Sequence, residues 1–313
     1  MHTFTYDVVF NCENCLKLEK HISLQERICM NTYGRKIITD IKHMITFKAC
    51  CKINLGLLIT ERRSDGYHNL QTVFYPVPLA DEISIEEAEE DKLDMSGIPI
   101  EGVTEDNLVL KAVRMLRSRG HKIPPLHIHL HKNIPNGAGL GGGSSDAAGM
   151  VRELNKHYSL GMTEEEMEQE VSSLGADCPF FIQCKPVYAE GIGNIFSHTP
   201  LNLSGMHLVL IKPNESVSTR EAYAQVQPRI PQSPLKELIL NPIEKWKGMV
   251  RNDFEKSVFP GHPVIENIKT QLYEMGAVYA SMSGSGSSVF GLFQEEPCME
   301  GRFEDMFVYS SPL

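Results

Sequence analysis

The segment "NIPNGAGLGGGSSDAAGM" (Asn133–Met150) decides how the chain is interpreted, because it holds six glycines between Gly137 and Gly149. Glycine- and serine-rich segments are typical of flexible linkers. This one follows an alternating strand pattern and leads into apolar residues at helical spacing, namely Ala147, Ala148, Val151 and Leu154. A glycine loop between a strand and a helix N-terminus directs backbone N–H groups at one point, so the sequence predicts a phosphate-binding loop.

The loop matches neither of two common nucleotide-binding motifs. It lacks the Lys-Ser/Thr pair that ends a Walker loop, and it is richer in glycine than the G-x-G-x-x-G fingerprint. Ser144 and Ser145, in the first turn of the expected helix, are able to donate hydrogen bonds to a phosphate or to ligate Mg²⁺. We therefore interpret the loop as an anion cradle of another class.

The overall charge restricts the partners that the protein can bind. The 313 residues have a formal net charge of −10, so the basic surface typical of nucleic-acid and anionic-membrane binding is missing. No segment approaches the roughly 20 uncharged apolar residues of a transmembrane helix. We therefore expect a protein that acts on a small molecule. If that molecule is an anion, its binding site must contain local positive charge or a metal ion.

The cysteines are scattered and show no disulfide framework. No secretory signal precedes them, so we expect a reducing, cytoplasmic location. Cys12 and Cys15 form a C-x-x-C pair, with His21 and Cys29 near enough in sequence to complete a zinc site. That spacing matches no standard zinc module, which makes the zinc alternative the weaker one. The full set is Cys12, Cys15, Cys29, Cys50, Cys51, Cys178, Cys184 and Cys298.

The first 43 residues differ from the rest of the chain. They lack sustained periodicity, and their acidic residues argue against an organellar transit peptide. From Met44 onward, "MITFKACCKINLGLLIT" has a strong strand pattern. We expect residues 1–43 to be an N-terminal extension outside the core fold, with Met44 as an alternative start.

The elements after Met44 are mixed. "KINLGLLIT" and "YHNLQTVFYPV", separated by the turn "ERRSDG", predict a β-hairpin. "DNLVLKAVRMLRSRG" predicts a helix with Asp106 as its N-cap, and Thr163 with Glu166 predicts a capping box on another. Beyond residue 200, "MHLVLIKP" and "VYASMSGSGSSVFGLF" predict strands, while "NPIEKWKGMVRNDFE" and "HPVIENIKTQLYEMG" predict helices. Because the βαβ rhythm is irregular, the fold class indicated is α+β.

The strand before the glycine loop has histidines on one face. "LHIHLHKNIP" alternates apolar residues with His127, His129 and His131, as a half-buried strand does. Three histidines on one face also suggest a metal site. Histidines at this spacing rarely converge on one ion without an acidic or thiolate partner, so a solvent-facing polar row is the favoured interpretation.

Several ordered motifs resemble one known family. "PNGAGLGGGSSDAA" is similar to the second signature of the GHMP kinases, the superfamily of galactokinase, homoserine kinase, mevalonate kinase and phosphomevalonate kinase. The form GLGGGSSDAA is characteristic of the 4-diphosphocytidyl-2-C-methyl-D-erythritol kinase branch. Further marks of that branch are "KINLGLLITERRSDGYHNLQTVF", "EDNL", "LGADCPFF" and "SGSGSSVF". The resemblance covers the chain from about Met44 to the C-terminus.

Two positions depart from the family pattern. Cys50 and Cys51 stand where the family usually has Pro-Ala, and Ala138 replaces one loop glycine. Alanine at that position requires a backbone conformation without positive φ.

The resemblance implies a fold and an activity. The fold is the two-domain α+β GHMP kinase architecture with a left-handed βαβ unit in the first domain. Residues 44–200 would form the ATP-binding domain, and residues 201–313 would complete the substrate site. The activity is phosphorylation of the 2-hydroxyl of 4-diphosphocytidyl-2-C-methyl-D-erythritol by MgATP, in the non-mevalonate isoprenoid pathway. The sequence fixes neither the Mg²⁺ ligands nor the oligomeric state, for which a homodimer stays open.

The resemblance also assigns the chemistry. Asp177 matches the catalytic base, and Lys52 would hold it ionised and stabilise the alkoxide that forms. From the residues alone, Asp177 follows the expected end of a helix at Gly175, where a carboxylate needs a nearby cation. An alternative is that Asp177 caps the following helix "CPFFIQ", and that Lys52 is a solvated edge residue.

On the substrate side, Tyr67 is assigned to stacking on the cytidine ring and His68 to hydrogen bonding with its edge. Asn54, Thr219 and Tyr223 match further substrate contacts. The alternative for the aromatic pair is ordinary strand packing.

On the ATP side, Asn107 and Lys132 match positions near the adenosine. The loop residues assigned to the phosphates are Pro135, Asn136, Gly137, Ala138, Gly139, Leu140, Gly141, Gly142, Gly143, Ser144 and Ser145. A third motif loop, otherwise an ordinary strand turn, consists of Ser283, Gly284, Ser285 and Gly286.

Two rival functions remain open at this stage. Another GHMP kinase would act on mevalonate or homoserine, but these substrates have no base for Tyr67 to stack on. A catalytically inactive nucleotide-binding regulator would not need both Lys52 and Asp177.

Overall fold

The computed structural model describes residues 28–30, 36–38, 44–100 and 103–313. The chain separates into two units, Met1–His43 and Met44–Leu313. In the first unit, β1 (Ile28–Met30) and β2 (Lys36–Ile38) pair antiparallel. Cys12, Cys15 and His21 of the alternative zinc site lie outside the described residues. All further description concerns the second unit.

A six-stranded sheet organises the first half of the second unit. Its two longest strands form the predicted hairpin and pair antiparallel along their whole length. The order is β5-β6-β4-β7-β8, with β3 on the other edge of β4. The strands are β3 (Ile45–Arg62), β4 (His68–Glu87), β5 (Lys92–Gly97), β6 (Leu126–Lys132), β7 (Val187–Glu190) and β8 (Ile195–His198).

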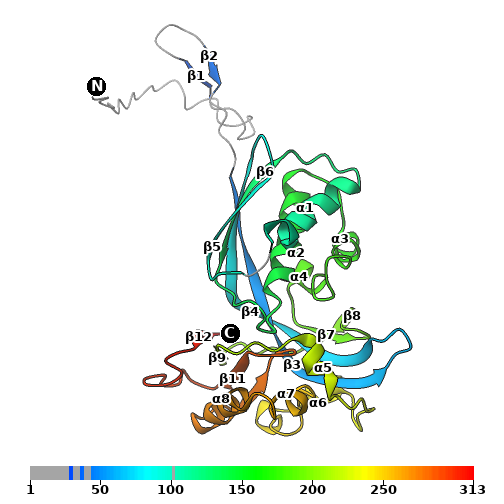
Figure 1. Ribbon diagram of the computed structural model, residues 1–313, viewed down its shortest axis with the longest axis vertical. Coiled ribbons are helices and arrows are strands. Elements are labelled where there is room, and N and C mark those ends of the chain that lie inside the picture. The colour runs from blue at the N-terminus through cyan, green and yellow to red at the C-terminus, as the bar shows by residue number, and fades with distance from the viewer. Residues whose placement is uncertain (1–27, 31–35, 39–43, 101–102) are drawn as a thin grey trace. The chain divides into compact units, whose positions relative to one another are not determined.

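Helices lie on one side of β3, β4 and β6 (Figure 1). β5 and β6 are parallel neighbours joined through α1, which makes a βαβ unit. The side chains of Leu126, Ile128 and Leu130 are buried, and the histidines of β6 lie on the opposite face, as the alternation predicted. The helices are α1 (Leu108–Ser118), α2 (Gly142–His157), α3 (Glu164–Val171) and α4 (Phe180–Gln183), with a 3-10 turn at Thr104–Asp106.

The helix ends confirm one predicted cap and correct another. The capping box of Thr163 and Glu166 is present at the start of α3. The N-cap of α1 is Asn107, whose Oδ1 accepts a hydrogen bond of 3.0 Å from the backbone N of Val109. Asp106 belongs to the preceding 3-10 turn, so its prediction as N-cap is wrong by one residue.

A four-stranded antiparallel sheet, in the order β10-β11-β9-β12, organises the second half. Its strands are β9 (His207–Lys212), β10 (Tyr279–Met282), β11 (Val289–Phe293) and β12 (Phe307–Pro312). The strands predicted beyond residue 200 are confirmed, as is the helix now seen as α8 (Pro263–Glu274). Shorter helices are α5 (Thr219–Ala224), α6 (Leu235–Leu238) and α7 (Glu255–Val258), with a 3-10 turn at Ile243–Lys245.

The helix predicted for "NPIEKWKGMVRNDFE" is wrong. Gly248 has a φ of +78°, which a helix does not allow. After Gly248 the backbone forms hydrogen bonds with β3 and not with the preceding helical turn. The backbone oxygen of Leu57 accepts from the N–H of Asp253 at 2.8 Å, and the N–H of Leu57 donates to the backbone oxygen of Arg251 at 2.9 Å. Tertiary pairing therefore overrides the local helical pattern.

β3 passes through three hydrophobic clusters. Phe47 and Ala49 pack under α1 and α2. Its middle residues, among them Ile53, pack against the four-stranded sheet and Trp246, and Ile59 packs with α8. A strand held by close packing on successive segments is a rigid support for the side chains that it positions.

The structure contains a disulfide between Cys50 and Cys184, which the sequence did not indicate. The two cysteines are 134 residues apart in sequence, so no local spacing pattern reveals the pair. The bond joins β3 to the residue that ends α4.

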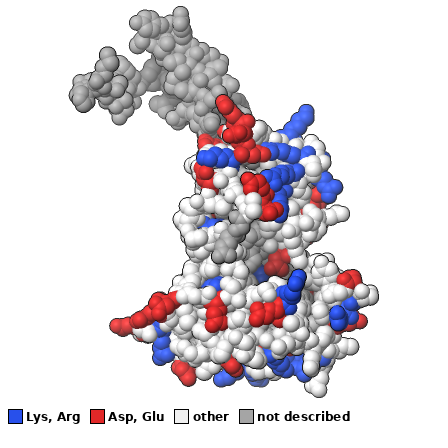
Figure 2. Space-filling model, viewed as in Figure 1, with Lys and Arg blue, Asp and Glu red and all other residues white. Residues whose placement is uncertain are grey.

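Charges of both signs are interspersed on the face of the molecule shown in Figure 2, over the part of the chain that the structure describes. In the same part of the chain, none of the helices is long and apolar enough to cross a membrane.

Candidate active site

Lys52 is the meeting point of three chain segments. Its side chain comes from β3 and is 4% exposed. Nζ donates to Oδ1 of Asn54 and to the backbone oxygen of Gly139, each at 2.8 Å. The same Nζ lies 3.5 Å from Oδ2 of Asp177. The lysine is therefore not the solvated edge residue of the alternative interpretation.

Asp177 lies in the turn between α3 and α4, with its side chain 36% exposed. Among the described residues, no side chain caps α4, and Pro179 occupies the N-cap position. The interpretation of Asp177 as a helix cap is therefore wrong. α3 ends at Val171, a few residues before the predicted stop at Gly175. The cation expected beside Asp177 is present as Lys52.

The glycine loop has alternating backbone conformations. Gly137, Gly139 and Gly141 have φ values of +59°, +72° and +73°, whereas Ala138 does not have positive φ, as predicted. Alternation of left-handed and right-handed residues directs successive N–H groups into one concavity, which favours an anion. α2 begins directly after Gly141 and adds its unpaired N–H groups.

The third motif loop contacts the glycine loop. Oγ of Ser283 donates to the backbone oxygen of Gly139 at 3.0 Å and accepts from the backbone N of Asn54 at 3.3 Å. Asn252, for which no sequence motif provides a signal, is buried and donates to the backbone oxygens of Met282 and Gly284, each at 2.8 Å. Asn252 thus holds the loop whose Ser283 contacts Gly139 and Asn54.

A pocket of about 350 Å³ lies beside the loop. It brings together several predicted ATP-side residues, namely Asn107, Lys132, Pro135, Asn136, Gly142 and Gly143. Met95, Ile100 and Val103 supply apolar lining. A pocket with a few polar groups next to an anion cradle has the chemistry of a nucleotide site.

Lys132 has a buried ion-pair network that the sequence analysis did not foresee. Nζ contacts Oδ2 of Asp81 and lies 2.7 Å from Oδ2 of Asp146. Burial works to lower the pKa of Lys132, but the two carboxylates outweigh it and raise that pKa above its ordinary value. Burial raises the pKa of Asp146 to about 7, against the attraction of Lys132. The ammonium group is therefore engaged by carboxylates at the wall of the pocket.

Asp81 also holds the start of the glycine loop. Its Oδ1 accepts hydrogen bonds from the backbone N atoms of Asn133, at 2.6 Å, and Ile134, at 2.8 Å. The sequence contains a signal for it, because Asp81 interrupts the inward apolar positions of β4 between Leu79 and Ile83. An acidic residue at a core-facing position needs strong partners, and here they are loop N–H groups and a lysine.

Two of the predicted substrate residues stack on each other, and two others are exposed and lie apart from that stack. The ring of His68 stacks on that of Tyr223, with centroids 4.9 Å apart and planes inclined by 20°. Burial, and next the charge of Asp177, raise the pKa of Tyr223. Tyr67 is 63% exposed and outside the stack, and Thr219 is an exposed residue at the start of α5.

Two family models match the chain. The model of the GHMP kinases N-terminal domain matches residues 107–185, and that of the GHMP kinases C-terminal domain matches residues 235–297. A 4-diphosphocytidyl-2-C-methyl-D-erythritol kinase of Bacteroides fragilis is 54% identical over 275 residues, which cover 86% of this chain and 100% of the relative. That of Bacteroides thetaiotaomicron is 56% identical over 257 residues, with 81% and 93% covered.

The chain belongs to the 4-diphosphocytidyl-2-C-methyl-D-erythritol kinase family. Its members are small-molecule kinases, so the predicted class of enzyme is confirmed. A crystal structure of a 4-(cytidine 5'-diphospho)-2C-methyl-D-erythritol kinase has a TM-score of 0.67 at 32% identity, covering 79% of this chain and 90% of that one. A phosphomevalonate kinase of Streptococcus pneumoniae, solved with phosphomevalonate and AMPPNP, has a TM-score of 0.61 at 15% identity, with 86% and 100% covered. The predicted two-domain α+β GHMP kinase fold is confirmed.

Both matched domains contribute residues to the candidate active site of this kinase. The N-terminal match contains Lys132, the glycine loop and Asp177, and the C-terminal match contains Asn252 and the third motif loop. Lys52 and Asn54 precede both matches and lie on β3.

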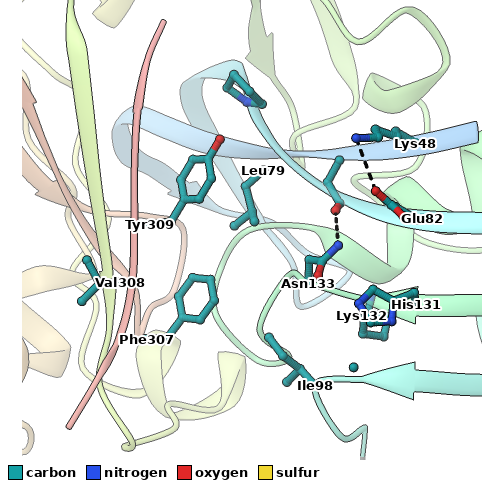
Figure 3. Close-up of a pocket in the computed structure, with 13 residues that line it drawn as sticks. Lys48, Leu79, Glu82, Ile98, His131, Lys132, Asn133, Phe307, Val308 and Tyr309 are labelled. Atoms are coloured by element: carbon teal, nitrogen blue, oxygen red, sulfur yellow. Dashed lines mark hydrogen bonds and ion pairs between the residues drawn. The ribbon is translucent and has the colours of Figure 1, made fainter. Parts of the chain in front are cut away.

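A second cavity, of about 600 Å³, lies away from the Lys52–Asp177 pair. Figure 3 shows Phe307 and Tyr309 of β12 on one side of it and Lys48 and Asn133 on the other. Neither Lys52 nor Asp177 lines it, so its larger volume does not make it the candidate active site of this kinase.

Proposed function

We propose that the protein transfers the γ-phosphoryl group of ATP to the 2-hydroxyl of 4-diphosphocytidyl-2-C-methyl-D-erythritol. The reaction belongs to the non-mevalonate isoprenoid pathway, and the enzyme acts in the cytoplasm without nucleic acid or membrane as partner. The observation that supports this most directly is the position of Lys52, whose Nζ joins Asp177 and the backbone of the glycine loop. The names of the relatives supply the acceptor.

ATP fits the pocket beside the glycine loop. Asn107 and the pocket wall would contact the adenosine, and residues 135–145 would surround the phosphates. Among the described residues, Oδ1 of Asp146 is buried without a hydrogen-bond partner, and Ser144 and Ser145 lie in the same turn. Carboxylate and hydroxyl oxygens of this kind are the ligands that Mg²⁺ prefers. Mg²⁺, when bound, would neutralise charge on the phosphates.

Asp177 is the general base in this proposal. Its carboxylate would take the proton of the acceptor hydroxyl, with the Lys52 ammonium group 3.5 Å away. A lysine ammonium has three donors, and Asn54 and Gly139 accept two of them. The third donor remains for Asp177 or for the alkoxide that forms on the substrate.

The cytidine would bind at the aromatic residues near Asp177. His68 and Tyr223 form a stacked surface there, and Tyr67 is exposed and free to stack on a base. Thr219 and Asn54 complete the proposed contacts. In this arrangement residues 44–200 bind ATP, and residues 201–313 contribute Tyr223 and the third motif loop to the acceptor side.

An acceptor assay tests the proposal. Purified protein with MgATP is offered the cytidyl substrate, mevalonate or homoserine, and ADP release is measured. We expect turnover only with the cytidyl substrate. Turnover of mevalonate or homoserine in its place would contradict the proposed acceptor, and ATP binding without any turnover would favour an inactive regulator.

A further inference from the structure

Outside the candidate active site, two histidines and two carboxylates gather on the face of the six-stranded sheet opposite α1 and α2. Glu86 lies on β4, Asp94 on β5, and His127 and His129 on β6. The strand pairing places Glu86 directly opposite His127, and Asp94 directly opposite His129. Three adjacent strands therefore bring these side chains together.

The distances within this cluster suit a metal ion. One ligand atom from each of Glu86, His127 and His129 lies within 4.8 Å of the other two. Nδ1 of His127 is 3.3 Å from Oε1 of Glu86, and the rings of His127 and His129 have centroids 4.0 Å apart. Metal–ligand bonds of about 2.0–2.2 Å place tetrahedral donor atoms roughly 3.3–3.6 Å apart, so small side-chain rotations complete the site.

We propose that Glu86, His127 and His129 bind Zn²⁺, or a divalent transition-metal ion of the same class, with Asp94 orienting His127. Two imidazoles and one carboxylate are a donor set that zinc prefers, and water would occupy the fourth position. Asp94 accepts from the other nitrogen of His127, Nε2, at 2.7 Å. Metal-bound histidines commonly have such a carboxylate partner, which fixes the ring and its protonation.

The charge of the cluster is compatible with a cation. Glu86 and Asp94 contribute two negative charges, and the nearest lysine, Lys92, contacts Asp94 at 2.8 Å. The histidines have only partly exposed side chains, 20% for His127 and 46% for His129.

The spacing of these histidines by itself argues against a metal site, because no acidic partner lies near them in the sequence. The structure removes that reason, since Glu86 and Asp94 come from other strands. A bound ion would join β4 to β6 and, through Asp94, to the edge strand β5. β5 includes Met95 and leads to Ile100 and Val103, which line the pocket beside the glycine loop. We therefore expect the ion to stabilise this edge of the fold, independently of the metal that accompanies ATP.

Zinc titration tests the proposal. The full-length protein, without an affinity tag and with Cys12→Ser and Cys15→Ser to remove the C-x-x-C pair, is titrated with ZnCl₂ by calorimetry. We expect one equivalent to bind. Replacing a ligand by His127→Ala, His129→Ala or Glu86→Gln should weaken binding by at least ~10-fold, and Asp94→Asn by roughly 10–100-fold.

His131→Ala is the matched control. His131 lies on the same strand and face but pairs with Ser96, 2.9 Å away, outside the cluster. Its replacement should leave zinc affinity unchanged, and circular dichroism should show that every variant is folded. Three results would each overturn the proposal: no saturable binding, equal binding by the His129→Ala protein, or a Co²⁺ complex whose absorption reveals thiolate ligands.

Discussion

The Nζ atom of Lys52 lies 3.5 Å from Oδ2 of Asp177, and the two side chains differ sharply in exposure. The lysine is 4% exposed and the aspartate 36%. A buried cation thus lies behind a carboxylate that an incoming molecule is able to reach. This arrangement places a cation beside the Asp177 carboxylate while leaving part of that carboxylate exposed.

Replacement of Asp177 separates chemistry from binding. We expect Asp177→Ala to lower kcat by at least the ~10²–10⁴-fold typical of a general base, while nucleotide affinity changes little. Turnover is measured with the cytidyl substrate, and binding with a fluorescent ATP analogue. Near-normal turnover would show that Asp177 is not the base.

The glycine loop offers a matched pair of substitutions. A Cβ atom on Gly139 would lie 2.1 Å from the backbone oxygen of Ser283, whereas one on Gly137 would meet no described atom within 4 Å. Both residues have positive φ, so each alanine costs about 1–2 kcal/mol of conformational strain. Gly139→Ala must also displace the third motif loop, since its Cβ would also lie 3.1 Å from the backbone oxygen of Gly286.

We expect Gly139→Ala to lower the free energy of unfolding by roughly 1–3 kcal/mol more than Gly137→Ala, and to lose most turnover. Chemical denaturation and initial rates measure the two effects. Equal effects of the two alanines would show that contact with Ser283 does not hold the loop.

Asn252 is predicted to position the third motif loop. Asn252→Ala removes a hydrogen bond from each of the backbone oxygens of Met282 and Gly284, and that of Met282 keeps only a 3.3 Å hydrogen bond from Oγ of Ser281. A buried acceptor left unsatisfied costs about 1–3 kcal/mol. We expect a lower kcat with little change in the KM for ATP. Asn214→Ala is the control, because Asn214 makes a similar hydrogen bond to Asp305 on the exposed surface. A fall in kcat of the same size in both variants would argue against a positioning role.

His262 predicts a pH-dependent contribution to stability. Hydrogen bonds to Glu221 and next to Glu215 raise its pKa above 6.5, and His262 lowers the pKa of Glu221 below 4.5. The stabilisation from His262 is full below its unfolded pKa and is lost as pH rises through its folded pKa. That from Glu221 is lost as pH falls through the lowered pKa of the glutamate.

We therefore expect His262→Gln to lower the melting temperature more at about pH 6 than at about pH 9, where both proteins have a neutral side chain. Thermal unfolding at the two pH values measures the difference. A constant difference would mean that the ion pairs contribute nothing. Because Glu221 lies on α5 with Tyr223, KM for the acceptor should follow the same trend.

A protein that begins at Met44 should retain full activity, because residues 44–313 form a compact unit of their own. Far-ultraviolet circular dichroism and the acceptor assay check the expectation. Unfolding or loss of turnover would show that residues 1–43 belong to the functional fold.

Several features could be predicted from local sequence. The hairpin of β3 and β4, the capping box of Thr163 and the phosphate loop all depend on residues close together in the chain. Glycine at alternate positions of the loop reflects backbone conformations that alanine avoids, and the structure has positive φ at those glycines but not at Ala138.

Other features depend on distant partners. Asn252 and the disulfide between Cys50 and Cys184 have partners far away in sequence, so no spacing pattern indicated them. The alternation of β4 marks Asp81 as an inward-facing acidic residue, but its partner Lys132 is 51 residues away. The helix predicted around Gly248 fails for the same reason, since β3 supplies the hydrogen bonds that the helix would have made.

The sequence by itself determined the family, the glycine loop between strand and helix and the residue types available for chemistry, because motifs and backbone preferences are local. Only the tertiary structure decided which charges meet. It placed Lys52 beside Asp177, engaged Lys132 with two carboxylates, and brought Glu86 and Asp94 to the histidines of β6. The physical reason is that ion pairing and metal coordination depend on distances of a few ångströms, which strand pairing and packing fix across the sheet.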